Sequence, residues 1–466
     1  MTVSPASGVV AAIPSHALII LFLQVGMLLL LAMVLGRLAV RCGMPPVVGE
    51  LTAGVAVGPS LLAHVAPGAG NWLFPQEPSQ MHLLDSLGQF GIILMLGFTG
   101  MHLDLKLLRR RGARAARISA AGLILPLALG IWLGFLLPAK LRAPGADGTA
   151  FALFVGVAMC VSSVPVIART LLDMQLIHRD VGQMIVITGT VDDAVGWLLV
   201  SLIAAMGTTG LHTGDVSLAL ARMALLLVFT ATIGRAVVGM AMRTAARASA
   251  PGLPAVTAVV LILLAAAGAG ALEFEPVFGA FLCGIVIGTA KGVDTRALSP
   301  LNTTVMTVLA PLFFATAGLR MDLTALSDPE MVVWGLAVFG LAVLGKFLGA
   351  FLGGLTSRMT RWESLALGAG MNARGVIEVI IAMVGVRIGL LTVEMYSIVV
   401  LVAVLTSLMA PPLLRFAMKR VELTAEEALR KTRMLTNHDT ADGVRDAADG
   451  GSPSTVPEPS GPVLHS

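Results

Sequence analysis

Apolar stretches of about twenty residues recur along the chain from His16 to Met418, and short segments rich in charged residues separate them. Each stretch is long enough to cross a hydrocarbon layer of about 30 Å as a helix. Strands of a membrane barrel would be shorter and would alternate apolar with polar positions. Because lipid offers no partner to unpaired backbone groups, the pattern predicts an all-α polytopic membrane protein.

The predicted spans number about thirteen. They cover residues 16–36, 44–63, 84–101, 118–138, 149–171, 181–206, 216–241, 253–272, 276–290, 301–319, 331–355, 363–386 and 393–417. Composition agrees, because 56% hydrophobic residues, 12% charged residues and a mean hydropathy of +0.90 are far from the balance of a soluble domain.

Basic residues predict the orientation of the chain, because cytoplasmic loops are rich in Lys and Arg. They cluster at the ends of the odd-numbered spans, at Arg37/Arg41, Lys106 to Arg117, Arg169/Arg179, Arg243/Arg247, Lys291/Arg296, Arg358/Arg361 and Arg415/Lys419/Arg420; the main exceptions are Lys140, Arg142, Arg320 and Arg387. The N-terminus is therefore expected outside an inner membrane and the C-terminus in the cytoplasm. The net charge of +4 then needs no nucleic-acid partner.

Three segments follow from this layout. Residues 1–15 are expected to form an extracytoplasmic N-terminus, residues 16–420 a transmembrane domain, and residues 421–466 a cytoplasmic tail. The tail is rich in Ala, Asp, Glu, Gly, Pro and Ser, which predicts that it is largely disordered, with one short helix over Thr424 to Met434. It is too short for a nucleotide-binding regulatory domain, which takes on the order of 100 residues.

The strongest candidate site is the adjacent pair Asp192 and Asp193, in the middle of the apolar run 181–206. One charged residue at a bilayer centre costs at least about 2.5–3.5 kcal/mol, so two neighbours are better explained by function than by a structural ion pair. Repulsion between the two acids favours holding a proton, and the same oxygens suit a small cation. Competition between proton and cation for one site is the basis of antiport.

A helix break is predicted just upstream. Pro165 lies inside a predicted span, where its ring removes one backbone hydrogen bond, so the helix should break near Ser163. Broken membrane helices free backbone carbonyls, and the Ser162 and Ser163 hydroxyls add oxygen ligands beside them. A kink satisfied by neighbouring helices is the structural alternative.

Two further groups carry charge inside spans. Lys346 lies mid-span in residues 331–355, far from both ends, and its proposed partner is Asp192; snorkelling to the interface is the alternative. Arg374 and Glu378 are four residues apart, so we expect them on one helical face, in a structural ion pair or a supporting transport role. Gly375 beside Asn372 predicts a second break, which would make the two halves inverted repeats.

Six motifs in this order resemble the monovalent cation:proton antiporter superfamily, in the branch of bacterial sodium/proton exchangers, potassium efflux antiporters and plant cation/proton exchangers. The resemblance covers roughly residues 16–418. The motifs are Ser162-Ser163-Val164-Pro165, Asp192-Asp193, Pro276-Val-Phe-Gly279-Ala-Phe281, Pro311-Leu-Phe-Phe-Ala-Thr-Ala-Gly318, Gly345-Lys346 and Met371-Asn372-Ala373-Arg374-Gly375.

The resemblance implies an NhaA-like fold with two crossed broken helices, a core domain that moves as an elevator against a dimerisation domain, and a homodimer. It implies Asp193 as the principal cation ligand, Asp192 as the second carboxylate paired with Lys346, and Ser162 and Ser163 as ligands at the crossing. An Asp-Asp pair with a lysine favours sodium. Potassium stays open, since the segment continuing to Glu378 is closer to the plant-type exchangers.

The expected function is thus secondary exchange of Na⁺ or K⁺ for H⁺, with no cofactor and no catalytic residues. A sodium-coupled symporter of an organic anion is the alternative on the same fold, although it would not require a buried lysine facing two carboxylates. An intramembrane aspartyl protease needs its two carboxylates on separate helices, commonly in a Gly-x-Gly-Asp setting, and Gly189-Thr190-Val191-Asp192 does not reproduce that setting. A cation channel would conduct without proton coupling.

Overall fold

The computed structural model describes residues 14–75, 78–101, 105–209, 213–247, 250, 252–290, 295–424 and 427. Most of the predicted N-terminal segment 1–15, of the tail 421–466 and of the short helix expected after Thr424 lies outside these residues. Within them, nine helices are long and apolar enough to cross a membrane. The remaining predicted spans coincide with two shorter apolar helices and two interrupted helix pairs, so each predicted span has a helical counterpart.

One group of helices, here called the scaffold bundle, packs through residues from both halves of the chain. It consists of α1 (Ser15–Arg41), α2 (Pro46–Val57), α5 (Pro78–Met101), α12 (Leu253–Ala271), α13 (Pro276–Thr289), α14 (Ser299–Thr304), η4 (Val305–Leu309) and α15 (Ala310–Leu319). Short helices α3 (Leu62–Val65) and α4 (Pro67–Leu73) connect α2 to α5.

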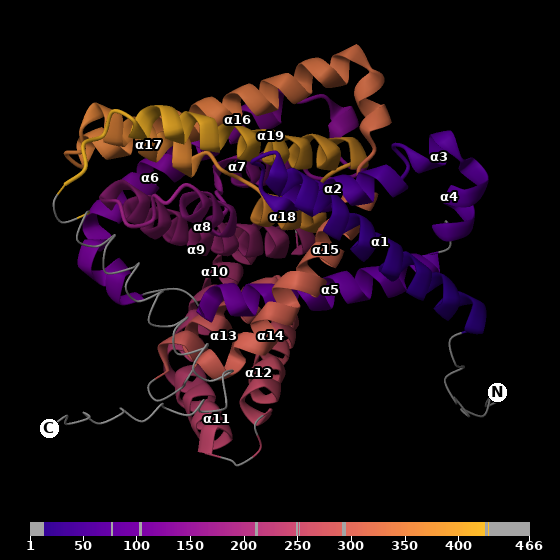
Figure 1. The fold of residues 1–466 in the computed structure, drawn as a ribbon, viewed down its shortest axis with the longest axis horizontal. Coiled ribbons are helices and arrows are strands. Elements are labelled where there is room, and N and C mark those ends of the chain that lie inside the picture. Colours follow the sequence, from indigo (N-terminus) through magenta and orange to yellow (C-terminus); the bar gives the residue numbers. More distant parts are fainter. Residues whose placement is uncertain are drawn as a thin grey trace, which may run out of the picture.

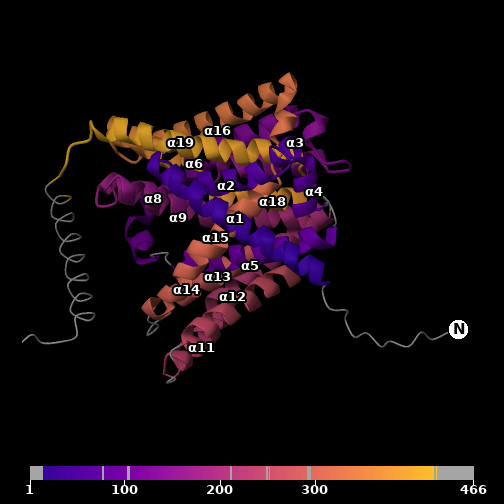
Figure 2. The same ribbon diagram turned by 45° about the vertical axis from the view of Figure 1, so that its right-hand side comes forward.

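The second group, the core bundle, holds every candidate site residue. It consists of α6 (Leu105–Leu136), α7 (Gly148–Cys160), α8 (Val164–Asp173), α9 (Asp180–Thr209), α16 (Pro329–Thr356), α17 (Arg361–Met371), α18 (Val376–Arg387) and α19 (Val393–Met418). In Figures 1 and 2 the core bundle fills the upper part of the molecule, and α5, α12 and α13 of the scaffold lie below it. The connecting helices α10 (Thr213–Phe229), η2 (Thr230–Gly234) and α11 (Arg235–Arg247) run from α9 to α12 and α13.

The two halves of the chain repeat the same contacts. Helix α2 packs on α15 as α13 packs on α5, α1 packs on α2 as α12 packs on α13, and α6 packs on α16. The interrupted pairs α7/α8 and α17/α18 occupy corresponding places in the two halves. The predicted inverted repeats with two broken helices are confirmed.

Glycines let the scaffold helices touch through their backbones. A Cβ atom added at Gly54 of α2 would lie 1.9 Å from the carbonyl oxygen of Ala315, and one at Gly318 of α15 would lie 2.0 Å from that of Leu51. In the corresponding crossing of α5 with α13, a Cβ at Gly284 would lie 1.9 Å from the Gly97 carbonyl oxygen. Close approach of this kind is a main source of helix association in lipid.

Replacing Gly318 by alanine is expected to lower the thermal unfolding midpoint measured in detergent by size-exclusion or fluorescence. The added methyl meets backbone rather than a movable side chain, so the cost should reach or exceed the roughly 1–3 kcal/mol of an overpacked core. Gly340→Ala is the matched control, because nothing lies within 4 Å of a Cβ placed at Gly340 of α16. Equal unfolding midpoints for the Gly318 and Gly340 variants would contradict the close backbone packing of α2 on α15.

The start of the tail packs on the core bundle through one carboxylate. Glu427, which is 2% exposed, accepts hydrogen bonds from the backbone N–H of Asp180 at 2.7 Å and of Thr424 at 3.0 Å. The Arg179 Nε lies 3.1 Å from its second oxygen, and Arg179 Nη2 also donates to the carbonyls of Val421 and Glu422. The carboxylate thereby caps the N-terminus of α9, the helix that carries Asp192 and Asp193.

Glu427→Gln is expected to expose the backbone amides of Asp180 and Thr424 to hydrogen exchange about tenfold faster at pH 7, since hydrogen bonds to a charged group are lost. Burial alone would raise the pKa of Glu427, but the N–H groups of Thr424 and Asp180 and the Arg179 guanidinium hold that pKa below its ordinary value of 4.5. The stabilisation is therefore present above that pH and is lost as the pH falls below it. Glu422→Gln is the control, because the Glu422 side chain is exposed. If hydrogen exchange became equally faster in both variants, the Glu427 hydrogen bonds to Asp180 and Thr424 would be contradicted.

Candidate functional site

Two interrupted helices cross at the centre of the core bundle. Helix α7 ends at Cys160 and α8 begins at Val164, while α17 ends at Met371 and α18 begins at Val376. The intervening segments bind each other: the Ser163 N–H donates to the Ala373 carbonyl at 3.2 Å, and the Ser162 hydroxyl donates to the Met371 carbonyl at 2.9 Å. Both predicted breaks are confirmed. Pro165 is the second residue of α8, where a missing N–H costs no intrahelical bond.

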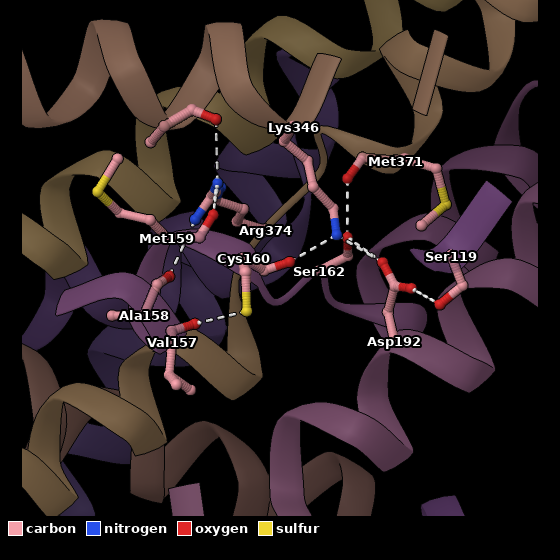
Figure 3. Close-up of polar contacts among 11 residues, drawn as sticks. Ser119, Val157, Ala158, Met159, Cys160, Ser162, Asp192, Lys346, Met371 and Arg374 are labelled. Atoms are coloured by element: carbon pink, nitrogen blue, oxygen red, sulfur yellow. Dashed lines mark hydrogen bonds and ion pairs between the residues drawn. The ribbon is translucent and has the colours of Figure 1, made fainter. Parts of the chain in front are cut away.

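Asp192 and Asp193 lie on α9 directly beside this crossing, and their exposed fractions are 0% and 1%. The Lys346 ammonium, on α16, lies 2.5 Å from Asp192 Oδ2. The other Asp192 oxygen accepts a hydrogen bond from the Ser119 hydroxyl of α6, and Ser162 Oγ lies 3.5 Å from Oδ2 (Figure 3). Asp192 is thus held by groups from three other segments of the core bundle.

Lys346 has a second partner that exists only because α7 is broken. Its Nζ donates to the Cys160 carbonyl at 2.6 Å, and Cys160 is the last residue of α7, so that carbonyl has no helical partner (Figure 3). The ammonium, which is fully buried, therefore occupies a position between a carboxylate and a freed carbonyl. These are the oxygen types that also bind a small hard cation.

Several buried polar atoms at the crossing have no hydrogen-bond partner among the protein groups that the structure describes. They are the Ser163 hydroxyl, both amide atoms of Asn372, and one Glu378 oxygen. Buried polar groups are nearly always hydrogen-bonded, so a cluster of exceptions marks atoms that can take another ligand. Ser163 and Asn372 belong to the two facing interruptions, so the crossing offers oxygen atoms next to the acidic pair.

The expected helical ion pair between Arg374 and Glu378 is wrong, because Arg374 lies in the interruption before α18 and not on a helix. Its guanidinium donates to the carbonyls of Ala158 at 3.0 Å, Met159 at 2.5 Å and Ala342 at 3.1 Å (Figure 3). Glu378 instead accepts from the Gly375 N–H at 2.7 Å and caps α18. Arg374 thus ties the end of α7 to α16.

Sequence reasoning missed Ser119 and the Cys160 carbonyl. A serine in an apolar span carries no signal by itself, and only the packing of α6 against α9 brings its hydroxyl to Asp192. The role of the carbonyl depends on where α7 ends and on the length of the lysine side chain across the bundle. The residues that were predicted, by contrast, do converge: Ser162, Ser163, Asp192, Asp193, Lys346 and Asn372 are all buried at or beside the crossing.

Comparison with known proteins agrees with this architecture. Residues 26–420 match the family described as sodium/hydrogen exchanger, transmembrane. The chain is 31% identical over 408 residues to cation/H⁺ antiporter 17 of Arabidopsis thaliana, covering 85% of this chain and 48% of the plant protein, so it spans about half the length of that relative. It is 28% identical to the Na⁺/H⁺ antiporter NhaS4 of Synechocystis, covering 86% of this chain and 97% of that one. Among solved structures, the sodium proton antiporter MjNhaP1 of Methanocaldococcus jannaschii superposes with a TM-score of 0.63 at 17% identity, covering 86% of this chain and 99% of that one.

Proposed function

This chain belongs to the sodium/hydrogen exchanger family, and from that premise we propose that it is a secondary antiporter that exchanges a monovalent cation for protons. The observation that carries the proposal is the placement of Lys346 against both Asp192 and the freed Cys160 carbonyl, with Asp193 buried at the next position of α9. A symporter would not require a buried lysine beside the acidic pair.

Exchange follows from competition at these oxygens. In one state the Asp193 carboxyl holds a proton; when that proton leaves to water, a cation binds the carboxylate together with oxygens of the crossing, such as the Ser163 hydroxyl and the Asn372 amide oxygen. Asp192 stays paired with Lys346 while this occurs, so the negative charge that binds the added cation comes from Asp193. Release of the cation on the other side restores the protonated carboxyl.

Movement is proposed at the boundary between the two bundles, in the manner of an elevator. The boundary carries few polar contacts, and those described lie at one end: Arg387 of α18 pairs with Glu275 at the start of α13, and the Tyr396 hydroxyl of α19 donates to the Ala317 carbonyl of α15 at 2.7 Å. These contacts close that end. A homodimer held through the scaffold bundle, with the core bundle moving against it, is part of the same proposal.

The orientation proposed is N-terminus outside and C-terminus in the cytoplasm of an inner membrane. It is supported by three of the four basic residues that depart from the pattern, because each of these three is paired with a carboxylate. Lys140 lies 3.3 Å from Glu330, Arg320 pairs with Asp85, and Arg387 pairs with Glu275. On this orientation the end of the boundary that carries these two contacts faces outside.

The test is a pH-sensitive dye trapped in proteoliposomes that contain the purified protein. Addition of sodium should alkalinise an acid-loaded lumen when the cation enters as protons leave, and potassium and lithium should be compared with sodium at acidic, neutral and alkaline pH. We propose sodium as the favoured cation and potassium as the second. Protein-free vesicles are the control, and no cation-driven pH change under any condition would remove the proposal.

A further inference from the structure

A cavity of about 550 Å³ lies at the end of the core bundle, away from the acidic pair. Its walls come from α6, from the first two turns of α9, from the turn between α16 and α17, and from the start of α17. Three arginines line it: Arg114 and Arg117 on α6, and Arg358 in the turn. Asp180 is some twelve residues, or about 18 Å along the helix axis, from Asp192.

The arginines lack ion-pair partners in the part of the chain that the structure describes. The Arg117 side chain donates from Nε to the Ala113 carbonyl at 3.3 Å, a contact within α6. The two acids of the cavity have local roles. Glu363 accepts from the Thr360 N–H at 2.7 Å in the capping box of α17, and Asp180 lies in the first turn of α9, where a carboxylate complements the helix dipole. Three cations facing two such acids leave the cavity with an excess of positive charge.

Arg358 is held in a backbone conformation that arginine rarely adopts. Its φ is 63°, and it follows the C-cap of α16 in a Schellman motif, in which Arg358 N–H donates to the Leu355 carbonyl and Met359 N–H to the Gly354 carbonyl, both at 3.1 Å. Glycine is the usual residue at this position, because it reaches the left-handed region without steric cost. Strain of this kind persists chiefly where the side chain has a use.

We propose that this cavity binds a phosphate-bearing anion, either the headgroup of an anionic lipid or a soluble phosphate. Arginine guanidinium groups present paired N–H donors that match phosphate oxygens, and three of them line this cavity without an ion-pair partner among the described residues. The site adjoins the turn where Glu427 fastens the tail to α9, so an occupant contacts the same end of the helix that carries the acidic pair. The binding inference stands independently of the exchange proposal, since it is measured without transport.

The test compares thermal unfolding midpoints of the purified full chain, followed by tryptophan fluorescence. One arm replaces chloride by inorganic phosphate at equal ionic strength in detergent; the other uses nanodiscs of phosphatidylcholine with or without phosphatidylglycerol. A rise of the unfolding midpoint with inorganic phosphate identifies a soluble anion as the ligand. A rise of the midpoint only with phosphatidylglycerol identifies a lipid headgroup. Titration with the anion that raises the midpoint should show that the affinity of R114Q/R117Q for this anion is lower by about tenfold or more, because charge-assisted hydrogen bonds are lost.

Two further variants make the result decisive. R243Q/R247Q removes the same charge from α11 and should keep the full response, which separates the site from general salt or membrane attraction. R358G should weaken anion binding without lowering the midpoint of the anion-free protein, because glycine relieves the left-handed strain. No response in the wild type, equal responses in the two double variants, or undiminished affinity in R358G would overturn the proposal.

Discussion

Asp193→Asn should abolish cation-dependent proton movement in proteoliposomes while leaving the protein folded and inserted. Asparagine keeps the size of the side chain but neither releases a proton nor offers a negative charge to the cation. Because the carboxylate sits in a buried site, its Coulombic contribution to cation binding cannot be replaced by the neutral amide. We expect the dye signal to fall to that of protein-free vesicles, with an unchanged elution profile and thermal midpoint within a few degrees.

Glu394→Gln is the matched control, since it removes one carboxylate from the first turn of α19, outside the crossing. This variant should retain exchange. Near-normal exchange by Asp193→Asn would remove Asp193 as the ligand, and loss of exchange in both variants would indicate that any change of charge in the core bundle is sufficient.

Lys346→Met should lower the free energy of unfolding by about 3–5 kcal/mol, because it leaves the Asp192 carboxylate buried without its counter-ion. The Cys160 carbonyl loses its donor as well. Adding Asp192→Asn in the same chain should recover much of this loss, since a neutral amide tolerates burial better than an unpaired charge. Thermal and denaturant unfolding of the two single variants and the double variant give the coupling free energy directly.

Lys140→Met provides the comparison. Its ion pair with Glu330 is exposed, with side-chain exposed fractions of 68% and 48%, so its loss should cost no more than about 1 kcal/mol. If Lys346→Met were as mild as Lys140→Met, or if Asp192→Asn added to its cost, the buried pair would not be stabilised as described. The transport assay adds a second readout: Lys346→Met removes one positive charge from the core bundle, which is the part proposed to move, so the dependence of exchange on membrane potential should change.

The order of the spans could be predicted from hydropathy because lipid imposes one simple requirement on every crossing segment. The two helix breaks were also readable, from Pro165 in one half and from Gly375 beside Asn372 in the other. Hydropathy alone could not assign helices to the two bundles, since that division depends on which faces of the spans meet. The glycine contacts of Gly54 and Gly318 show the difficulty: glycines are frequent throughout the chain, and only the fold selects those that touch backbone.

The acidic pair and Lys346 were found from sequence because a charge in an apolar run is costly and conspicuous. Arg374 was found for the same reason but misplaced, since its spacing from Glu378 suits a helix that is interrupted at that very point. Glu427 shows the opposite case. It lies in the short helix predicted over Thr424 to Met434, where no sequence signal marks it as buried, yet the structure buries it against Arg179 and the start of α9.

The three carbonyls bound by Arg374 limit how the site can open. Separation of α7 from α16 or from the second interruption would take at least one carbonyl acceptor from the buried Arg374 guanidinium, which is costly because a buried polar group without a partner is destabilising. The segments that carry these groups therefore move together as one rigid unit, which comprises Ala158, Met159, Ala342 and Arg374. Distances between spin labels placed on these segments should stay fixed through a transport cycle. Water must then reach the acidic pair along the outside of this rigid unit and not between its segments.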